Sequence, residues 1–199
     1  MTAVAAVVVV IVLAVAWRRR YPAPYPPRLA FLLDIPLRGL RPRPAQLARQ
    51  LGLEPEMRVL EIGPGSGVFT RALVDLDRPA RLVCLDLQPA MLHGLRRRLG
   101  ARTPSLVCGD ARALPFRDGS FGRILLVSVL GEVPNRDRAL RECARLLSDD
   151  GELVVAESLI DPDYISPSTL AREAMDVGLV TVGQVGPWSS YTQRLARSV

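Results

Sequence analysis

The sequence contains no lysine, a single histidine and only three cysteines. All 26 basic residues are therefore arginines. The cysteines, Cys84, Cys108 and Cys143, form no CxxC pair, which argues against a disulfide framework or a zinc site and fits a reducing compartment. His93 lies beside a run of arginines, as expected for a surface residue and not for a catalytic base. Proton transfer, where the chemistry needs it, is left to carboxylates and tyrosines.

A basic surface is also missing from most of the chain, although the net charge is +6. Residues 18–43 hold seven arginines against one acid, Asp34, whereas residues 44–199 hold 19 charges of each sign. The larger part therefore lacks the basic face of nucleic-acid binders, and we expect no nucleic-acid partner. With 199 residues, 49% of them apolar, the chain is long enough for one domain with a full core.

Residues 3–17 carry no charged or polar side chain. A helix of this length reaches about 22 Å, somewhat less than a hydrocarbon core of about 30 Å. Trp17 and the arginines at 18–20 suit the membrane interface. A signal peptide would need positive charge before the apolar run, and a buried core helix is the other alternative. We expect residues 1–20 to be a single uncleaved transmembrane helix with an arginine collar, followed on the cytoplasmic side by the rest of the chain.

Residues 21–43 read as a connecting segment. Four prolines in residues 21–27 favour a stiff, extended linker. Residues 28–40, RLAFLLDIPLRGL, favour a short amphipathic helix that is broken near Pro36. Such a helix lies on the bilayer, caps a pocket or packs on the domain, and the sequence leaves these alternatives open. The remaining residues, 44–199, form the domain.

Helical and strand patterns alternate through this domain. Apolar runs without an exposed face indicate strands that are buried on both faces of a parallel sheet. A hairpin around Gly186, Pro187 and Trp188 makes the last strand antiparallel to its neighbour. The expected fold is α/β: a three-layer, Rossmann-like, doubly wound and mostly parallel seven-stranded sheet with a terminal antiparallel hairpin. The expected helices cover 45–53, 67–76, 88–100, 135–151 and 166–179, and the strands 57–63, 80–87, 104–110, 121–131 and 152–159.

The stretch VLEIGPGSGVFT, residues 59–70, predicts a strand, a glycine turn and a helix. Its glycines have the spacing GxGxG, and Val68 occupies the position where a dinucleotide fingerprint, GxGxxG, needs its third glycine. This spacing disfavours a nicotinamide oxidoreductase. Glu61 lies two residues before the first glycine.

Two further acids follow the next two predicted strands. Asp86 ends the second strand, where a carboxylate accepts hydrogen bonds from the hydroxyls of a ribose. Asp110 ends the third strand, where a carboxylate and the next backbone amide, that of Ala111, read the edge of an adenine. Parallel strands place Glu61, Asp86 and Asp110 at one edge of the sheet, where ligands bind in open α/β folds.

The chain resembles the class I S-adenosylmethionine-dependent methyltransferases, in the branch with the ubiquinone and menaquinone biosynthesis enzymes (methyltransferase type 11). The stretches that carry the resemblance are VLEIGPGSGVFT, LVCLDLQPAML, LVCGDARALPF and FGRILLVSVLGEVPNRDRALRECARLLSDDGELVVAE, which cover roughly residues 45–160 in the family's order. SDDG at 148–151 departs from the family's KPGG-like structural turn.

The resemblance implies S-adenosylmethionine as the cofactor and assigns each matching residue a place around it. Glu61, Gly63, Gly65 and Gly67 would line the methionine portion. Asp86 would bind the ribose, with Leu87 and Met91 against the adenine. Asp110 and Ala111 would lie on the adenine edge, and Ser128 would face both cofactor and substrate.

Acceptor residues are less constrained by the sequence. Glu132 follows the fourth strand and binds an amine or accepts a phenol's proton, unless it is a surface acid before Pro134. Glu157, at the end of the fifth strand, is a second candidate. Tyr164, Trp188 and Tyr191 are aromatics that stack on a substrate or belong to the core.

We expect methyl transfer to a hydrophobic or membrane-associated small molecule, such as a prenylated quinol or a lipid. The alternatives are a phospholipid amine as the acceptor, and a membrane-tethered scaffold that binds S-adenosylmethionine without catalysis.

Overall fold

The computed structural model describes residues 44–76 and 81–198. The transmembrane helix expected in residues 1–20 and the linker and cap expected in residues 21–43 lie outside these ranges. Within them, no helix has both the length and the apolar character needed to cross a bilayer.

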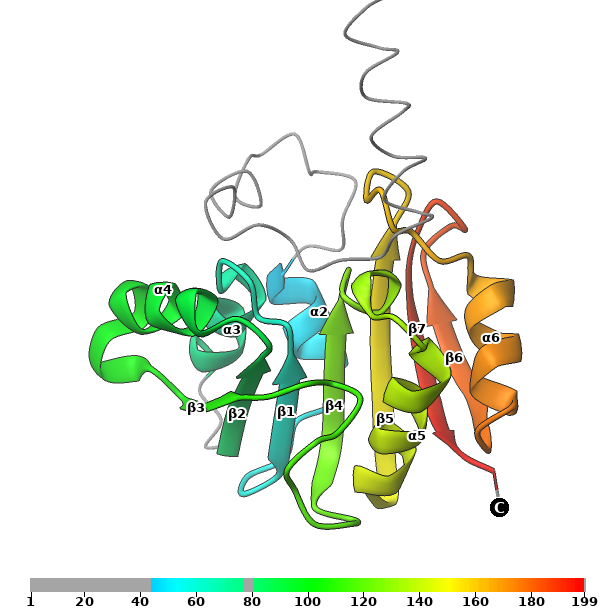
Figure 1. Cartoon of the computed structure of the whole chain (residues 1–199), viewed down its shortest axis with the longest axis horizontal. Coiled ribbons are helices and arrows are strands. Elements are labelled where there is room, and N and C mark those ends of the chain that lie inside the picture. The colour runs from blue at the N-terminus through cyan, green and yellow to red at the C-terminus, as the bar shows by residue number, and fades with distance from the viewer. Residues whose placement is uncertain (1–43, 77–80, 199) are drawn as a thin grey trace, which may run out of the picture.

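Seven strands form one sheet in the order β3-β2-β1-β4-β5-β7-β6 (Figure 1). Strands β1 to β5 pair in parallel, and β7 runs antiparallel to both of its neighbours. The expectation of a mostly parallel sheet with a terminal hairpin is therefore confirmed. The strands are β1 Arg58–Ile62, β2 Arg81–Asp86, β3 Ser105–Cys108, β4 Phe121–Val127, β5 Leu147–Ser158, β6 Leu179–Val185 and β7 Ser190–Arg197.

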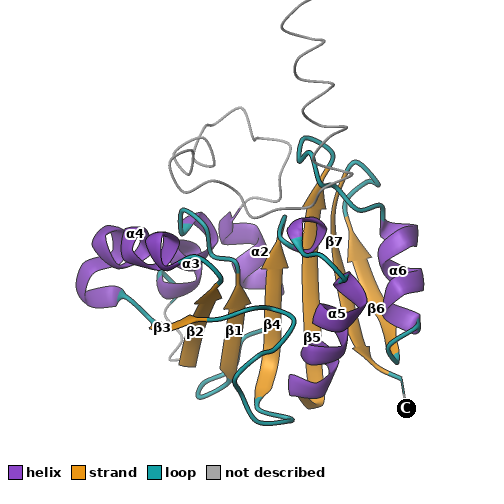
Figure 2. Ribbon diagram, viewed as in Figure 1, coloured by secondary structure: helices purple, strands orange, loops and turns teal. Residues whose placement is uncertain are grey.

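Helices cover both faces of this sheet (Figure 2). Apolar residues of α5 and α6 belong to the cluster on one face, and those of α2 and α3 to the cluster on the other. The helices are α2 Pro44–Gln50, α3 Val68–Val74, α4 Pro89–Leu99, α5 Arg136–Leu146 and α6 Pro167–Met175, with short 3-10 turns η3 Gly100–Arg102 and η4 Leu130–Glu132.

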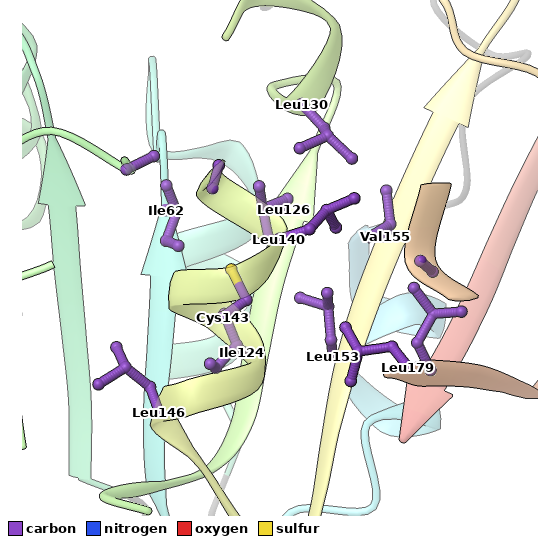
Figure 3. Close-up of a cluster of buried hydrophobic side chains, with 14 of the residues drawn as sticks. Ile62, Ile124, Leu126, Leu130, Leu140, Cys143, Leu146, Leu153, Val155 and Leu179 are labelled. Atoms are coloured by element: carbon purple, nitrogen blue, oxygen red, sulfur yellow. The ribbon is translucent and has the colours of Figure 1, made fainter. Parts of the chain in front are cut away.

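The central strands are buried on both faces, as their unbroken apolar runs predict. In β5, Leu153 and Val155 belong to the cluster beneath α5 and α6, whereas Val154 and Ala156 belong to the cluster beneath α2 and α3. Figure 3 shows side chains of α5, β4 and β5 packed together in the first cluster. Because burying one leucine side chain contributes about 2 kcal/mol, this packing fixes where α5 lies on the sheet.

Several element boundaries differ from the sequence-based expectation, and two of them have a clear physical reason. The helix expected over 135–151 ends at Leu146, and β5 begins at once at Leu147. Gly151 therefore does not close a helix. It lies where the pairing of β4 with β5 shifts register, and a Cβ there would lie 3.0 Å from the carbonyl oxygen of Phe121. The fourth strand ends at Val127 because Ser128 has a left-handed backbone, with φ of 55°.

The C-terminal part follows its sequence pattern. Ser166 is the N-cap of α6, and its hydroxyl accepts a hydrogen bond from the backbone amide of Thr169 at 3.2 Å. The turn between β6 and β7 holds Trp188. Because β7 is antiparallel to β5, with Ser190 opposite Ser158, this turn lies at the carboxyl end of β5.

Candidate active site

The carboxyl ends of four strands meet at one edge of the sheet. Ile62 at the end of β1 pairs with Leu85 of β2 and Leu126 of β4, and Asp86 pairs with Cys108 at the end of β3. The candidate cofactor residues of the sequence analysis belong to these strand ends or to the segments that follow them. The structure therefore gathers them along a single edge, as the strand order requires.

The glycine turn joins β1 to α3 and needs glycine for its backbone shape. Gly63, Gly65 and Gly67 have φ values of 67°, 55° and 82°, all in the left-handed region that side chains disfavour. The Gly63 amide donates to the carbonyl of Leu85 at 2.8 Å, which ties the turn to the end of β2. The turn thus presents bare backbone toward the strand ends.

Neighbouring side chains also leave no space at this turn. A Cβ on Gly63 would lie 2.5 Å from Cγ2 of Val129, and one on Gly67 would collide with Cδ1 of the buried Leu95 in α4. The Arg98 guanidinium of the same helix donates to the carbonyl oxygen of Ser66 at 2.5 Å. Helix α4 and the segment after β4 therefore hold the turn from two sides.

Replacing Gly67 with alanine is expected to lower the free energy of unfolding by about 2 to 4 kcal/mol, from left-handed strain and overpacking against Leu95. Gly94 is the matched control, because it lies within α4 and a Cβ there has no atom within 4 Å. Gly94→Ala should stabilise the protein by up to about 1 kcal/mol. Urea denaturation of both variants measures the two changes, and equal effects would contradict the described packing.

Glu61 is a buried carboxyl group beneath the glycine turn, with 3% of its surface exposed. Its Oε2 accepts hydrogen bonds from the Thr70 hydroxyl at 2.7 Å and the Cys84 thiol at 3.4 Å. Burial raises the pKa of Glu61 to about 7, although both hydrogen bonds favour the ionised form. A carboxyl group with this pKa changes its charge near neutral pH when a cation binds beside it.

Asp86 ends β2 and is 6% exposed. Its Oδ1 accepts a hydrogen bond from the Gln88 amide at 2.9 Å, and the Gly65 amide also donates to this carboxylate. Burial raises the pKa of Asp86, and the two amide hydrogen bonds oppose that rise. The side chain therefore joins the second strand end to the glycine turn.

Asp110 lies beyond β3 and is held by an arginine that the sequence analysis did not single out. The Arg112 guanidinium donates to Oδ1 at 3.0 Å through Nε and to Oδ2 at 2.7 Å through Nη2, and the Arg112 amide donates to Oδ1 at 2.8 Å. These hydrogen bonds lower the pKa of Asp110. A nucleobase amine that binds Asp110 has to share its oxygens with Arg112. Ala111, between the two residues, is buried.

The two residues expected against the adenine differ in exposure. Leu87, just after β2, has 50% of its surface exposed, whereas Met91 on α4 is buried in the core. Contact of either residue with adenine stays a prediction. His93 is exposed on α4, as expected.

Ser128 follows β4, where its amide donates to the Ala156 carbonyl at 2.9 Å. Its hydroxyl oxygen is buried and has no hydrogen-bond partner within residues 44–76 and 81–198. Buried hydroxyls are normally paired, so this oxygen suits a partner that a bound molecule brings. The next residue, Val129, lies against the glycine turn.

The expected acceptor residues do not all face this edge. Tyr191 is fully buried in the core, and its hydroxyl donates to the Ile165 carbonyl at 2.9 Å, which fits the core alternative, while its contact with a substrate stays a prediction. Tyr164 donates to the carbonyl of Trp188, which joins the loop after β5 to the β6–β7 turn. Glu132 lies in η4, directly after Ser128 and Val129, and Glu157 is buried at the end of β5.

Several functional neighbours left no signal in the sequence. Thr70 and Cys84 meet Glu61 from a helix and a strand that are separated from it by 9 and 23 residues. Arg112 is the exception, since a basic residue two positions after an acid at a strand end is a local pattern that sequence reading can detect.

The donors and acceptors at this edge fit S-adenosylmethionine. The buried carboxylate of Asp86 suits ribose hydroxyls, which are hydrogen-bond donors, and the unpartnered hydroxyl of Ser128 lies at the same edge. Glu61 provides an acidic group near the glycine turn for a cationic end of the ligand.

Comparison with known proteins agrees with this geometry. Residues 60–155 match the model of a methyltransferase domain. The chain is 39% identical over 100 residues to a malonyl-[acyl-carrier protein] O-methyltransferase of Halorhodospira halophila, and 38% identical over 109 residues to a ubiquinone/menaquinone biosynthesis C-methyltransferase of Bordetella avium. The first match covers 50% of this chain and the second 53%, but they span only 34% and 42% of the relatives' own lengths.

Solved structures share the fold. An S-adenosylmethionine-dependent methyltransferase from Aquifex aeolicus superposes with a TM-score of 0.76 at 18% identity, over 88% of this chain and all of that one. The trans-methyltransferase CalH, in a complex with SAH, has a TM-score of 0.66 at 21% identity, over 78% of this chain and 55% of that one. Residues 60–155 therefore match a methyltransferase domain, and the chain shares the Rossmann-like fold of these solved structures.

Proposed function

We propose that this chain transfers the methyl group of S-adenosylmethionine to a hydrophobic or membrane-associated small molecule, such as a prenylated quinol or another lipid. The observation that carries the proposal is an apolar surface beside the site. Leu159 and Ile160, after β5, are 44% and 43% exposed, and Trp188 is 64% exposed. Exposed apolar groups that cluster at a site favour an apolar ligand.

These three residues belong to two segments that contact each other. The amide of Leu159 donates to the carbonyl of Ser189 at 2.8 Å, and Tyr164 donates to the carbonyl of Trp188. The apolar surface therefore lies at the carboxyl end of β5, on the same edge as Ser128. Similarity to a quinone biosynthesis C-methyltransferase further supports an apolar acceptor.

Bound S-adenosylmethionine supplies an activated methyl group, and the chain supplies alignment and proton handling. The Glu132 amide donates to the Val129 carbonyl at 2.9 Å, which fixes the start of η4 beside the glycine turn. Gly131 packs directly against the backbone of Asp163, with no room for a Cβ. Glu132 is thereby held between the cofactor side and the acceptor side, where its carboxylate accepts a proton from an acceptor hydroxyl.

A phospholipid amine is the second candidate acceptor. The loop after β5 carries Asp161 and Asp163 next to the apolar surface, and Glu132 lies beside it across the Gly131 contact. Carboxylates beside an apolar surface suit an acceptor with an ammonium group and hydrocarbon chains.

The sequence of residues 1–20 supports a single-pass anchor with the domain in the cytoplasm, because the arginines follow the apolar run.

The test incubates the full chain with methyl-labelled S-adenosylmethionine and either a membrane lipid extract or a water-soluble metabolite extract. The proposal expects label in the organic phase, on a species that mass spectrometry identifies as a quinol or an amine lipid. Label found only in water-soluble products or on an acyl carrier protein would overturn the hydrophobic acceptor. Binding of the cofactor without transfer to any extract would favour the scaffold alternative.

A further inference from the structure

The loop that carries Asp110 is fastened to α5 by two side chains that lie outside the cofactor site. This segment, residues 109–120, connects β3 to β4 and contains no α-helix. Within it, the Ala113 amide donates to the Asp110 carbonyl at 3.0 Å and the Phe116 amide to the Leu114 carbonyl at 2.9 Å, and both bonds shape local turns. A segment with so few internal hydrogen bonds depends on its neighbours for its position.

Glu142 on α5 accepts a hydrogen bond from the Leu114 amide at 2.7 Å. Arg145, one turn further along the helix, donates to the carbonyls of Leu114 at 3.0 Å and Phe116 at 2.9 Å. It also donates to the Asp118 carboxylate at 2.6 Å. Both side chains therefore bind the backbone of the loop and not only its exposed side chains.

The pair is also bound to itself. Nε of Arg145 donates to Oε1 of Glu142 at 2.9 Å, and Nη2 donates to Oε2 at 2.8 Å. The guanidinium group has five N–H donors, and the contacts to Glu142, Leu114, Phe116 and Asp118 supply an acceptor for each of them. The arrangement lowers the pKa of Glu142 and raises that of Arg145, so both groups stay charged at neutral pH. A lysine has no planar fork and cannot reproduce this geometry.

We propose that Glu142 and Arg145 are positioning residues, which hold the loop so that Asp110 and Ala111 can read the adenine of the cofactor. The inference rests on the placement of adenine at Asp110. Three residues separate Asp110 from Leu114, the first loop residue that the pair binds, so a shift at Leu114 reaches Asp110 through a short stretch of backbone. Ribose and methionine contacts come from β1, β2 and the glycine turn, which the pair does not touch.

Calorimetry with S-adenosylhomocysteine and S-inosylhomocysteine tests the positioning role. Inosine lacks the amine from which Asp110 would accept a hydrogen bond. Arg145→Lys should weaken binding of the adenosyl ligand by about tenfold and leave the inosyl ligand nearly unchanged. Arg141→Lys is the matched control, since Arg141 lies on the same helix and forms a salt bridge with exposed Asp137. It should change neither affinity. Glu142→Gln provides a second variant if Arg145→Lys unfolds in a thermal melt.

The outcomes separate this inference from the site on which it rests. Equal weakening of both ligands, or no change in either, would overturn the positioning role. Equal affinity of the unaltered protein for the two ligands would show instead that Asp110 does not read the base. If Asp110→Asn removes the preference for adenine but Arg145→Lys and Glu142→Gln keep it, the positioning role fails and the adenine site stands.

Discussion

Asp86→Asn is expected to weaken the binding of S-adenosylhomocysteine by about 10- to 100-fold, because charge-assisted hydrogen bonds to a ribose are each worth about 1.5 to 3 kcal/mol. The substitution keeps the volume of the side chain but removes its charge and replaces an acceptor oxygen with a donor nitrogen. That nitrogen would face either a ribose hydroxyl or the amides of Gly65 and Gln88, which also need an acceptor.

The measurement is isothermal titration calorimetry at pH 7.5, with a thermal melt to confirm that the variant is folded. Asp150→Asn is the control, because Asp150 is an exposed acid near the start of β5, at the opposite edge of the sheet. It should bind with unaltered affinity. A folded Asp86→Asn protein with the affinity of the original would show that the ribose lies elsewhere.

The second large effect is on pH dependence. Because the pKa of Glu61 is about 7, the carboxyl group of the free protein is mostly protonated at pH 6. S-adenosylmethionine carries an ammonium and a sulfonium group, and a cation beside Glu61 favours the ionised carboxylate. Binding therefore releases a proton, and the affinity should rise by about tenfold for each pH unit below the pKa and level off above it.

Calorimetry between pH 5.5 and 7.5, in buffers with different heats of ionisation, measures both the affinity and the proton release. Glu61→Gln should bind more weakly at pH 7.5 and show almost no slope. An affinity that falls as the pH rises, or an equal slope in Glu61→Gln, would contradict the assignment of Glu61 to the cationic end of the cofactor.

The same shift has a consequence for stability without the cofactor. A folded-state pKa near 7 exceeds the ordinary value of 4.5, so the folded protein keeps a proton that the unfolded chain releases between these values. The contribution of this bound proton to the free energy of unfolding is therefore present at low pH and is lost as the pH rises from 4.5 to about 7. The loss amounts to about 3 kcal/mol over the 2.5 units that separate 7 from 4.5. Glu61→Gln should remove this decline.

Local patterns in the sequence predicted most of the fold. The apolar runs of β1, β4 and β5 and the glycines at 63, 65 and 67 depend on backbone geometry and burial, which a short window of residues reveals. The end of α5 was not predicted, because LLSDDG continues a helical pattern while tertiary pairing with Phe121 draws Leu147 into the sheet.

Long-range contacts explain what the sequence did not reveal at the site. Tyr191 is an aromatic residue of the kind that stacks on substrates. Its position in β7, opposite Glu157, places its side chain in the core. In the sequence, Glu142 and Arg145 have the spacing of an ordinary ion pair on a helix surface. In the structure, the loop with Leu114 and Phe116 packs against this pair. Such contacts join segments that lie 28 and 29 residues apart, beyond any local pattern.

The most direct test of the cofactor site is a crystal structure of the full chain with S-adenosylhomocysteine. The ribose hydroxyls should lie within hydrogen-bond distance of Asp86, the adenine amine beside Asp110, and the amino acid end near Glu61 and the glycine turn. A nucleoside bound away from this edge, with Asp86 still engaged only by the amides of Gly65 and Gln88, would contradict the site.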